Sequence, residues 1–182
     1  MSVAEDHVLL MERLWERVLE IALDEVGPKE QRGNNRGECE KYLRPLGLPP
    51  GSPYCVAGIR WCFDEACREL NSRNPLPKTG GVIKLFSRTP SWMRGKEALM
   101  GPAIGGHRST SNPNLGHVAI VLPWDAERPA VASTLEFNTN KAGSRDGDGV
   151  YLRTRSWDYF DLGYIDPRGF KYEDRVCRAP VA

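Results

Sequence analysis

The sequence predicts an α+β fold in which N-terminal helices pack on an antiparallel β-sheet. Helical periodicity of apolar residues dominates the first part of the chain, whereas short β-like runs separated by turn clusters follow residue 116. Helices first and hairpin-connected strands later is the order typical of α+β proteins. The 182 residues contain no repeat, low-complexity tract or linker, so we expect one domain over residues 1–182.

The N-terminal segment is expected to form an amphipathic helix that covers a core. Its apolar residues recur at helical spacing, namely Val8, Met11, Trp15, Val18, Ala22 and Val26. Charged residues interrupt them and no basic region precedes them, so neither a signal peptide nor a membrane span is predicted. Mixed charges on the polar face also disfavour a helix lying on a membrane. We expect a protein made in the cytoplasm and not inserted into a membrane.

A second helix is predicted from Ser52-Pro53 to about Leu70. Ser is a preferred N-cap and Pro a preferred first helical residue, and the sequence NSRNPLP that follows stops the helix. The region from there to Asn114 lacks periodicity except around residues 82–86, so we expect mainly loop, with His107 exposed in it. Four short strands are then predicted, over residues 117–122, 131–137, 150–154 and 159–165.

The charge balance argues against a nucleic-acid partner. Lys and Arg number 25 against 24 Asp and Glu, which leaves a formal charge of +1. Such a chain has no global field that would attract nucleic acid or an anionic membrane, and any basic patch must be local. Oligomeric state is not predicted.

The five cysteines, at positions 39, 55, 62, 67 and 177, do not form a predicted disulfide framework or zinc site. Cys55 and Cys62 are seven residues apart on one helix, about 10 Å along its axis, beyond the roughly 7 Å that a disulfide spans. No CxxC or HxxxH spacing suits zinc. Cys62 and Cys67 are interpreted as small core residues, whereas Cys39 and Cys177 are left open.

Cys55 stands in the first turn of the second helix, where free N–H groups and the helix dipole stabilise a thiolate. A nucleophilic cysteine also needs a base, and otherwise Cys55 is an ordinary packed residue. His117 opens a predicted strand directly after Gly116, so its ring can face a cleft. Glu136 and Asn138 alternate onto one face of the next strand, where either can orient the imidazole. The set matches the Cys-His-Asn arrangement of papain-like enzymes.

Three segments resemble the CHAP-type, NlpC/P60-like amidohydrolases and peptidases, many of which are peptidoglycan hydrolases of bacteria and phages. They read NNRGECEKYLRPLGLPPGSPYCVAGIRWCFDEA, GHVAIV and TLEFNTNKAGSRDGDGVYLRTR. The likeness spans residues 20–165, and its specific parts are the segment around Cys55 and residues 136–155. It implies a papain-like fold and hydrolysis of an amide bond without a metal or cofactor.

Carried over by position, the resemblance implies that Cys55 is the nucleophile, His117 the base and Glu136 the polar third member. Asn138 falls where such enzymes often have a further polar residue. The chain departs from the family at Tyr54, where some CHAP enzymes have a Gln, and it lacks the Pro-Gly-Asp stretch before the His strand and the acidic calcium loop of some phage members.

The function expected from the resemblance is cleavage of peptidoglycan at the cell wall by a phage- or bacterium-encoded enzyme. Either an N-acetylmuramoyl-L-alanine amidase or an endopeptidase of the stem or cross-bridge fits. Two alternatives stay open. One is a thiol peptidase or amidase with a substrate outside the wall, and the other is a non-catalytic virion or wall-binding component.

Overall fold

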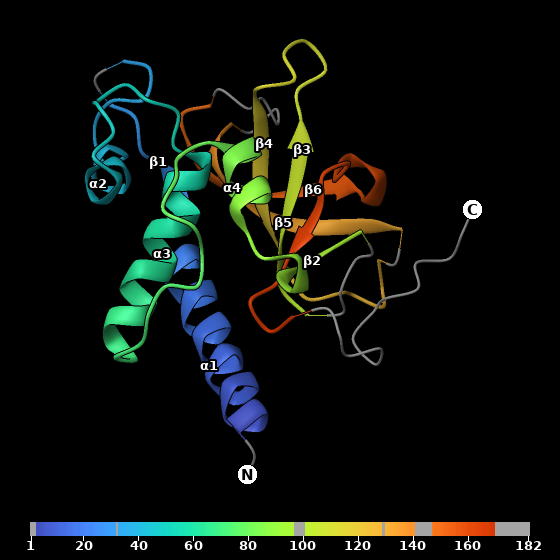
Figure 1. The fold of residues 1–182 in the computed structure, drawn as a ribbon. Helices are drawn as coiled ribbons and strands as arrows, with labels where there is room; N and C mark the ends of the chain where they lie inside the picture. Colours follow the sequence, from blue (N-terminus) through green and yellow to red (C-terminus); the bar gives the residue numbers. More distant parts are fainter. Residues whose placement is uncertain (1–2, 32, 97–100, 129, 141–146, 170–182) are drawn as a thin grey trace.

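The structure is a computed structural model of the 182-residue chain that describes residues 3–31, 33–96, 101–128, 130–140 and 147–169. Cys177 lies outside these residues. Within them, α-helices pack against one seven-stranded sheet in which every strand pair is antiparallel. The predicted α+β class is therefore confirmed (Figure 1).

The helices are α1 (Val3–Asp24), α2 (Glu40–Leu43), α3 (Cys55–Glu69) and α4 (Val82–Arg88), with 3-10 turns η1 (Arg44–Leu46), η2 (Ser91–Met93) and η3 (Trp157–Tyr159). The strands are β1 (Gly27–Pro28), β2 (Arg94–Gly95), β3 (Ala103–Arg108), β4 (Gly116–Val121), β5 (Val131–Thr139), β6 (Gly149–Ser156) and β7 (Gly163–Ile165). Their order in the sheet is β1-β6-β5-β4-β3-β7-β2.

The largest hydrophobic cluster joins α1 and α3 to one face of the sheet. The predicted stripe of α1 is buried at Met11, Trp15, Val18 and Ala22, but Val26 is 40% exposed. The helix ends at Asp24 because the chain turns into the short strand β1, which places Val26 outside the stripe. No helix of the described ranges is both long and apolar enough to cross a bilayer.

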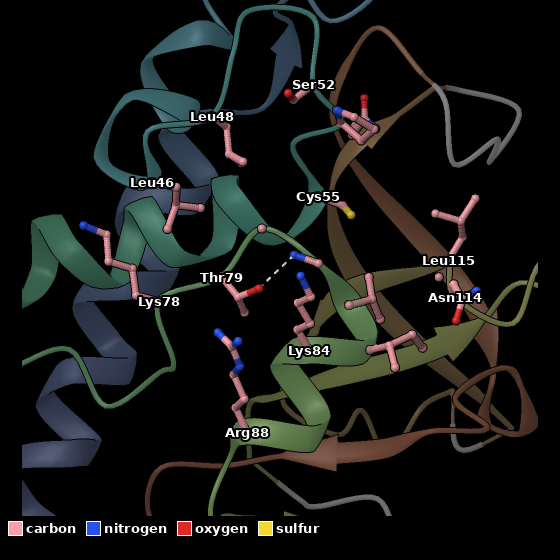
Figure 2. A pocket seen from close by; sticks show the side chains of 17 residues that line it. Leu46, Leu48, Ser52, Cys55, Lys78, Thr79, Lys84, Arg88, Asn114 and Leu115 are labelled. Atoms are coloured by element: carbon pink, nitrogen blue, oxygen red, sulfur yellow. Dashed lines mark hydrogen bonds between the residues drawn. The ribbon is translucent and has the colours of Figure 1, made fainter.

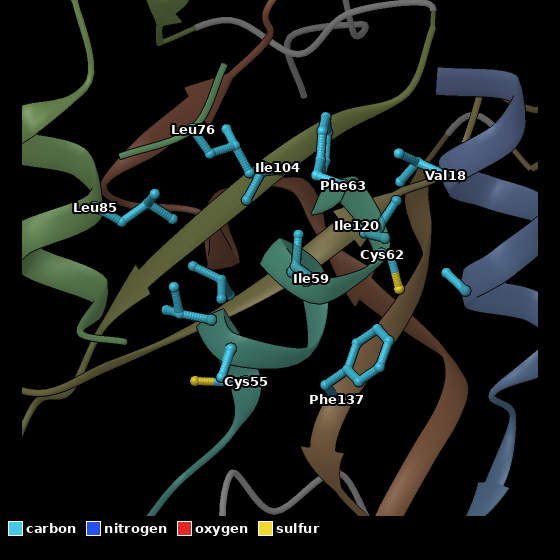
Figure 3. Close-up of a cluster of buried hydrophobic side chains, with 14 of the residues drawn as sticks. Val18, Cys55, Ile59, Cys62, Phe63, Leu76, Leu85, Ile104, Ile120 and Phe137 are labelled. Carbon is cyan, nitrogen blue, oxygen red and sulfur yellow. The ribbon is translucent and has the colours of Figure 1, made fainter. Parts of the chain in front are cut away.

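Helix α3 approaches β5 closely, and a glycine makes this possible. A Cβ on Gly58 would lie only 2.1 Å from Cδ1 of Phe137. Ile59 and Phe63 of the same helix are buried in the shared cluster (Figure 3). The start of α3 is therefore pressed against the central strands, β4 and β5.

The prediction that Ser52 caps α3 is wrong. The hydroxyl of Ser52 donates to the carbonyl oxygen of Pro49, 2.8 Å away. The residue before the helix is Tyr54, and Cys55 is the first helical residue. This shift leaves Cys55 in the first turn, as predicted, and moves it to the very end of the helix.

The loop expected before Asn114 contains the helix α4 and the strands β2 and β3. Strand β3 escaped prediction because its centre is Gly105-Gly106, which hides the alternation of apolar residues. Both glycines have a packing reason, since a Cβ on either would lie 2.4 Å or less from the ring of Phe160 or Phe86. His107 therefore stands in a strand, opposite His117, rather than in an exposed loop.

Candidate active site

Cys55 borders a cleft of about 540 Å³ (Figure 2). Its side chain points out from the end of α3, and only 6% of the residue is exposed. The cleft walls come from the chain before α3, from the loop leading into α4 and α4 itself, from the chain entering β4, and from Asn138 of β5. A sulfur in this position is accessible from the cleft while it is largely shielded from bulk solvent.

The other described cysteines lie away from the cleft. Cys39, Cys62 and Cys67 are buried and, like Cys55, form no disulfide. Burial raises the pKa of each of these three thiols, to about 11 for Cys39. They are protonated at neutral pH, which agrees with the interpretation of Cys62 and Cys67 as core residues and extends it to Cys39.

His117 is buried at the start of β4, with 1% of its surface exposed. Its Nε2 lies 3.0 Å from Oε2 of Glu136, and its Nδ1 is buried without a hydrogen-bond partner among the described residues, so Nδ1 is the ring nitrogen available to Cys55. Burial alone would lower the pKa of His117, but interaction with Cys55 and with Glu136 outweighs burial and raises this pKa to about 9. The imidazole is therefore cationic at neutral pH, and the cation stands beside the sulfur of Cys55.

Glu136 is fully buried and accepts hydrogen bonds from three side chains. Besides His117, the hydroxyl of Thr134 donates to Oε1 at 2.7 Å. Arg155 donates from Nε to Oε1 at 2.8 Å and from Nη2 to Oε2 at 2.6 Å. Burial opposes the charge of Glu136, but His117 and Arg155 overcome it and lower the pKa of the carboxyl to about 2. Glu136 is thus a fixed anion.

Asn138 does not share the position of Glu136. The register of Ile120 with Leu135, continued along the strands, would place Asn138 opposite His117. A bulge between Phe137 and Thr139 interrupts β5 there, and Asn138 has a left-handed φ of 58°. Asn138 is buried against the cleft, next to Cys55, whereas His117 reaches diagonally to Glu136.

An aromatic stack supports Arg155, and sequence analysis did not find it. The guanidinium carbon lies 4.5 Å from the ring centre of Tyr159, which stacks on the ring of His107 at 4.3 Å. Nδ1 of His107 in turn lies 3.1 Å from a carboxylate oxygen of Asp161. The side chains of Glu136, Arg155 and Tyr159 thus form a continuous support behind the imidazole.

The alternation of residues in β6 does not predict that the side chain of Arg155 is buried. The apolar residue Leu152 is 52% exposed, whereas the side chain of Arg155 is only 14% exposed. A pattern that normally places apolar residues inward therefore assigns Arg155 to the solvent face. The carboxylate of Glu136 on the neighbouring strand and the ring of Tyr159 account for its orientation.

Tyr54 provides no group for the cleft. Its ring is buried and stacks on Tyr42, and its hydroxyl donates to Glu30 at 3.3 Å. Tyr54 therefore anchors the loop before α3. The backbone N–H of Cys55 has no acceptor four residues earlier in the helix, because Cys55 is the first helical residue. This N–H is the donor that the site offers to a developing oxyanion.

Metal ligation is not indicated by the described residues. In those ranges, no group of three or more His, Cys, Asp or Glu side chains is placed to hold a metal ion. The site residues themselves offer a sulfur that can act as a nucleophile, an imidazolium that can donate a proton, and a carboxylate that holds the imidazolium in place.

Comparison with known proteins assigns no family. No family model matches this chain, and no curated protein matches it. A solved structure described as "The crystal structure of Ly7917" is similar with a TM-score of 0.46 and 16% sequence identity over 82% of this chain. This chain spans 59% of the length of that structure. A likeness at this level assigns neither fold nor function.

We expect Arg155→Met to lower kcat about 10- to 100-fold with little change in KM, because the pair of hydrogen bonds from the guanidinium that orients Glu136 is lost. Without the guanidinium the pKa of Glu136 rises, so the acid limb of the pH–rate profile moves to higher pH. Arg155→Lys keeps the positive charge but not the paired hydrogen bonds, so it should shift this limb less than Arg155→Met does. Steady-state rates of the three proteins across pH measure both effects. An Arg155→Met protein with wild-type kcat and an unmoved profile would contradict this role.

Proposed function

We propose that this protein is a cysteine-dependent hydrolase that cleaves an amide bond of peptidoglycan. The observation that supports the proposal best is the contact between His117 and Glu136 directly behind Cys55, at the edge of a cleft. These are the three residues for which the resemblance to CHAP-type and NlpC/P60-like enzymes implies catalytic roles.

The proposed reaction uses a thiolate at Cys55, an imidazolium at His117 and a carboxylate at Glu136. The thiolate of Cys55 attacks the carbonyl carbon of the amide, and the N–H of Cys55 donates to the oxyanion that forms. The imidazolium of His117 then protonates the leaving amine as the C–N bond breaks, which leaves a thioester on Cys55. Neutral His117 next removes a proton from water, which hydrolyses the thioester and restores the pair. Glu136 stays ionised throughout and stabilises the imidazolium.

Catalysis is a better explanation of the site than a purely structural or wall-binding role. A carboxylate, a guanidinium and an imidazolium are buried together behind Cys55. Burial of charged groups is costly even when they are paired, and such groups cluster at functional sites. A non-catalytic wall-binding component has no need of a cationic imidazole beside a cysteine. The substrate class, peptidoglycan, comes from the resemblance in sequence, and a peptidase or amidase with another substrate is the second candidate.

The proposal is tested by incubating purified bacterial cell wall with the protein. We expect free amines and soluble muropeptides to appear, and mass spectrometry of the muropeptides to identify the bond that is cut. The Cys55→Ala protein is the matched control and should release neither. If walls of several chemotypes yield no product while unrelated peptide amides are hydrolysed, the substrate assignment is wrong and the second candidate is correct.

A further inference from the structure

The cleft beside Cys55 has an uneven distribution of charge. Three of its lining residues are cations, namely Lys78, Lys84 and Arg88, and none is an acid. The chain as a whole has nearly equal numbers of basic and acidic residues, so this imbalance is local. All three cations are exposed, and their side chains make no ion pair with an acid in the described ranges.

Two of the cations, Lys84 and Arg88, lie on the same helix at one side of the cleft. Lys84 and Arg88 are one helical turn apart on α4, and Lys78 precedes α4 (Figure 2). Figure 2 shows the side chain of Lys84 directed towards the open space in front of Cys55. Like charges at this spacing repel each other, so they disfavour the helix unless an anion binds between them. Arg88 alone has a second explanation, as a basic residue in the last turn of α4. That explanation does not apply to Lys84.

The remaining lining residues suit a peptide chain. Leu46, Leu48 and Leu115 contribute apolar surface on the other walls, and Leu115 is 42% exposed. A cleft with apolar walls and one cationic side is complementary to a ligand with an apolar body and an anionic group. A carboxylate accepts paired hydrogen bonds from the planar guanidinium of Arg and a charge-assisted hydrogen bond from the ammonium of Lys.

We propose that the cleft selects a substrate with a free carboxylate close to the scissile amide, and that Lys84 and Arg88 bind this carboxylate. The inference rests on the proposed function, because it locates the carboxylate relative to the bond that Cys55 attacks. The substrate class is an acidic peptide, such as a peptidoglycan stem whose α-carboxyl groups are free. A stem in which the same carboxyl is a carboxamide is then a poor ligand.

Binding is measured separately from catalysis, by calorimetric titration of Cys55→Ala protein with two soluble muropeptides. The two differ only in one stem group, which is a carboxylate or a carboxamide. We expect the carboxylate form to bind about tenfold more tightly, and higher ionic strength to weaken only this form. Lys84→Gln or Arg88→Gln, added to Cys55→Ala, should abolish the difference. Arg13→Gln, which removes an exposed helical cation outside the cleft, should preserve it.

The two muropeptides also separate failure of this inference from failure of the proposed function. Equal dissociation constants for the two forms, or a difference that survives both Lys84→Gln and Arg88→Gln, overturn the inference even if wild-type protein hydrolyses both. A fall in kcat for Lys84→Gln with unchanged dissociation constants also overturns it, because Lys84 would then act on the transition state. Failure of the wild-type protein to hydrolyse either form contradicts the proposed function. The dissociation constants of the two forms still show whether Lys84 and Arg88 bind a carboxylate.

Discussion

Replacement of Cys55 by Ala is expected to abolish hydrolysis, with a loss on the order of 10⁴-fold or more. In the proposed reaction the sulfur of Cys55 forms the bond to substrate, and no other described cysteine lines the cleft. The fold should survive, since the change removes one sulfur from a residue at the rim of the core. Product formation from cell wall, together with thermal unfolding, measures the two properties.

Cys62→Ala is the matched control for this substitution. Cys62 is fully buried on the same helix, so its replacement should cost about 1 kcal/mol of unfolding free energy or more and leave the rate per folded molecule unchanged. A folded Cys55→Ala protein that still hydrolyses the wall would disprove the nucleophile assignment.

Alkylation by iodoacetamide reports on the same assignment without mutation. Only a thiolate reacts readily, and burial keeps Cys39, Cys62 and Cys67 as thiols near neutral pH. Cys55 should therefore be labelled before these three, with loss of activity in proportion to its labelling.

The second large effect is expected at Glu136. Glu136→Gln should lower kcat about 10²- to 10⁴-fold, because the amide can still hydrogen-bond to His117 but cannot balance the imidazolium charge or hold the same tautomer. Arg155 also loses its anionic partner in this variant, which adds an uncompensated buried charge. Steady-state kinetics and unfolding curves separate the catalytic effect from the structural one.

The pH dependence of the same variant has a defined sign. The pKa of His117 is raised, so its stabilising contact with Glu136 is fully present below the ordinary histidine pKa of 6.5 and is lost as pH rises through about 9. The alkaline limb of the wild-type rate profile should fall in the same window. Removal of the carboxylate charge lowers the pKa of His117, so Glu136→Gln should move this limb to lower pH.

Asn138 provides the comparison that can contradict this assignment. Its backbone is left-handed, so Asn138→Ala introduces strain, whereas Asn138→Gly removes the amide without strain. We expect Asn138→Gly to cost far less activity than Glu136→Gln. If Asn138→Gly loses most of its activity while Glu136→Gln keeps close to wild-type activity, the third catalytic residue is Asn138. The contact between His117 and Glu136 is then not the catalytic one.

The sequence alone was sufficient for features that depend on local pattern. Apolar spacing predicted most of the buried face of α1, the Ser-Pro start signal predicted α3 to within a few residues, and turn residues separated the strands that form most of the sheet. The position of Cys55 at a helix start and of His117 at a strand start are likewise local properties. Both are therefore visible in the order of residues before any fold is known.

The different positions of Glu136 and Asn138 depend on the tertiary structure. Alternation in a regular strand places both on one face, and the bulge that separates them arises from the pairing of β5 with β6. The strand β3 likewise could not be predicted from the sequence. Its glycines make room for aromatic rings that come from elsewhere in the chain.

Arg155 and the cationic side of the cleft also depended on contacts between distant segments. Arg155 is drawn inward by a carboxylate nineteen positions earlier in the chain, on the adjacent strand. Lys84 reaches the cleft because α4 and the start of α3 border the same open space. Local sequence pattern determines which residues form helices and strands and which face is apolar. The distances between charged groups that belong to different elements are decided by how those elements pack, because packing brings them out of water and into contact.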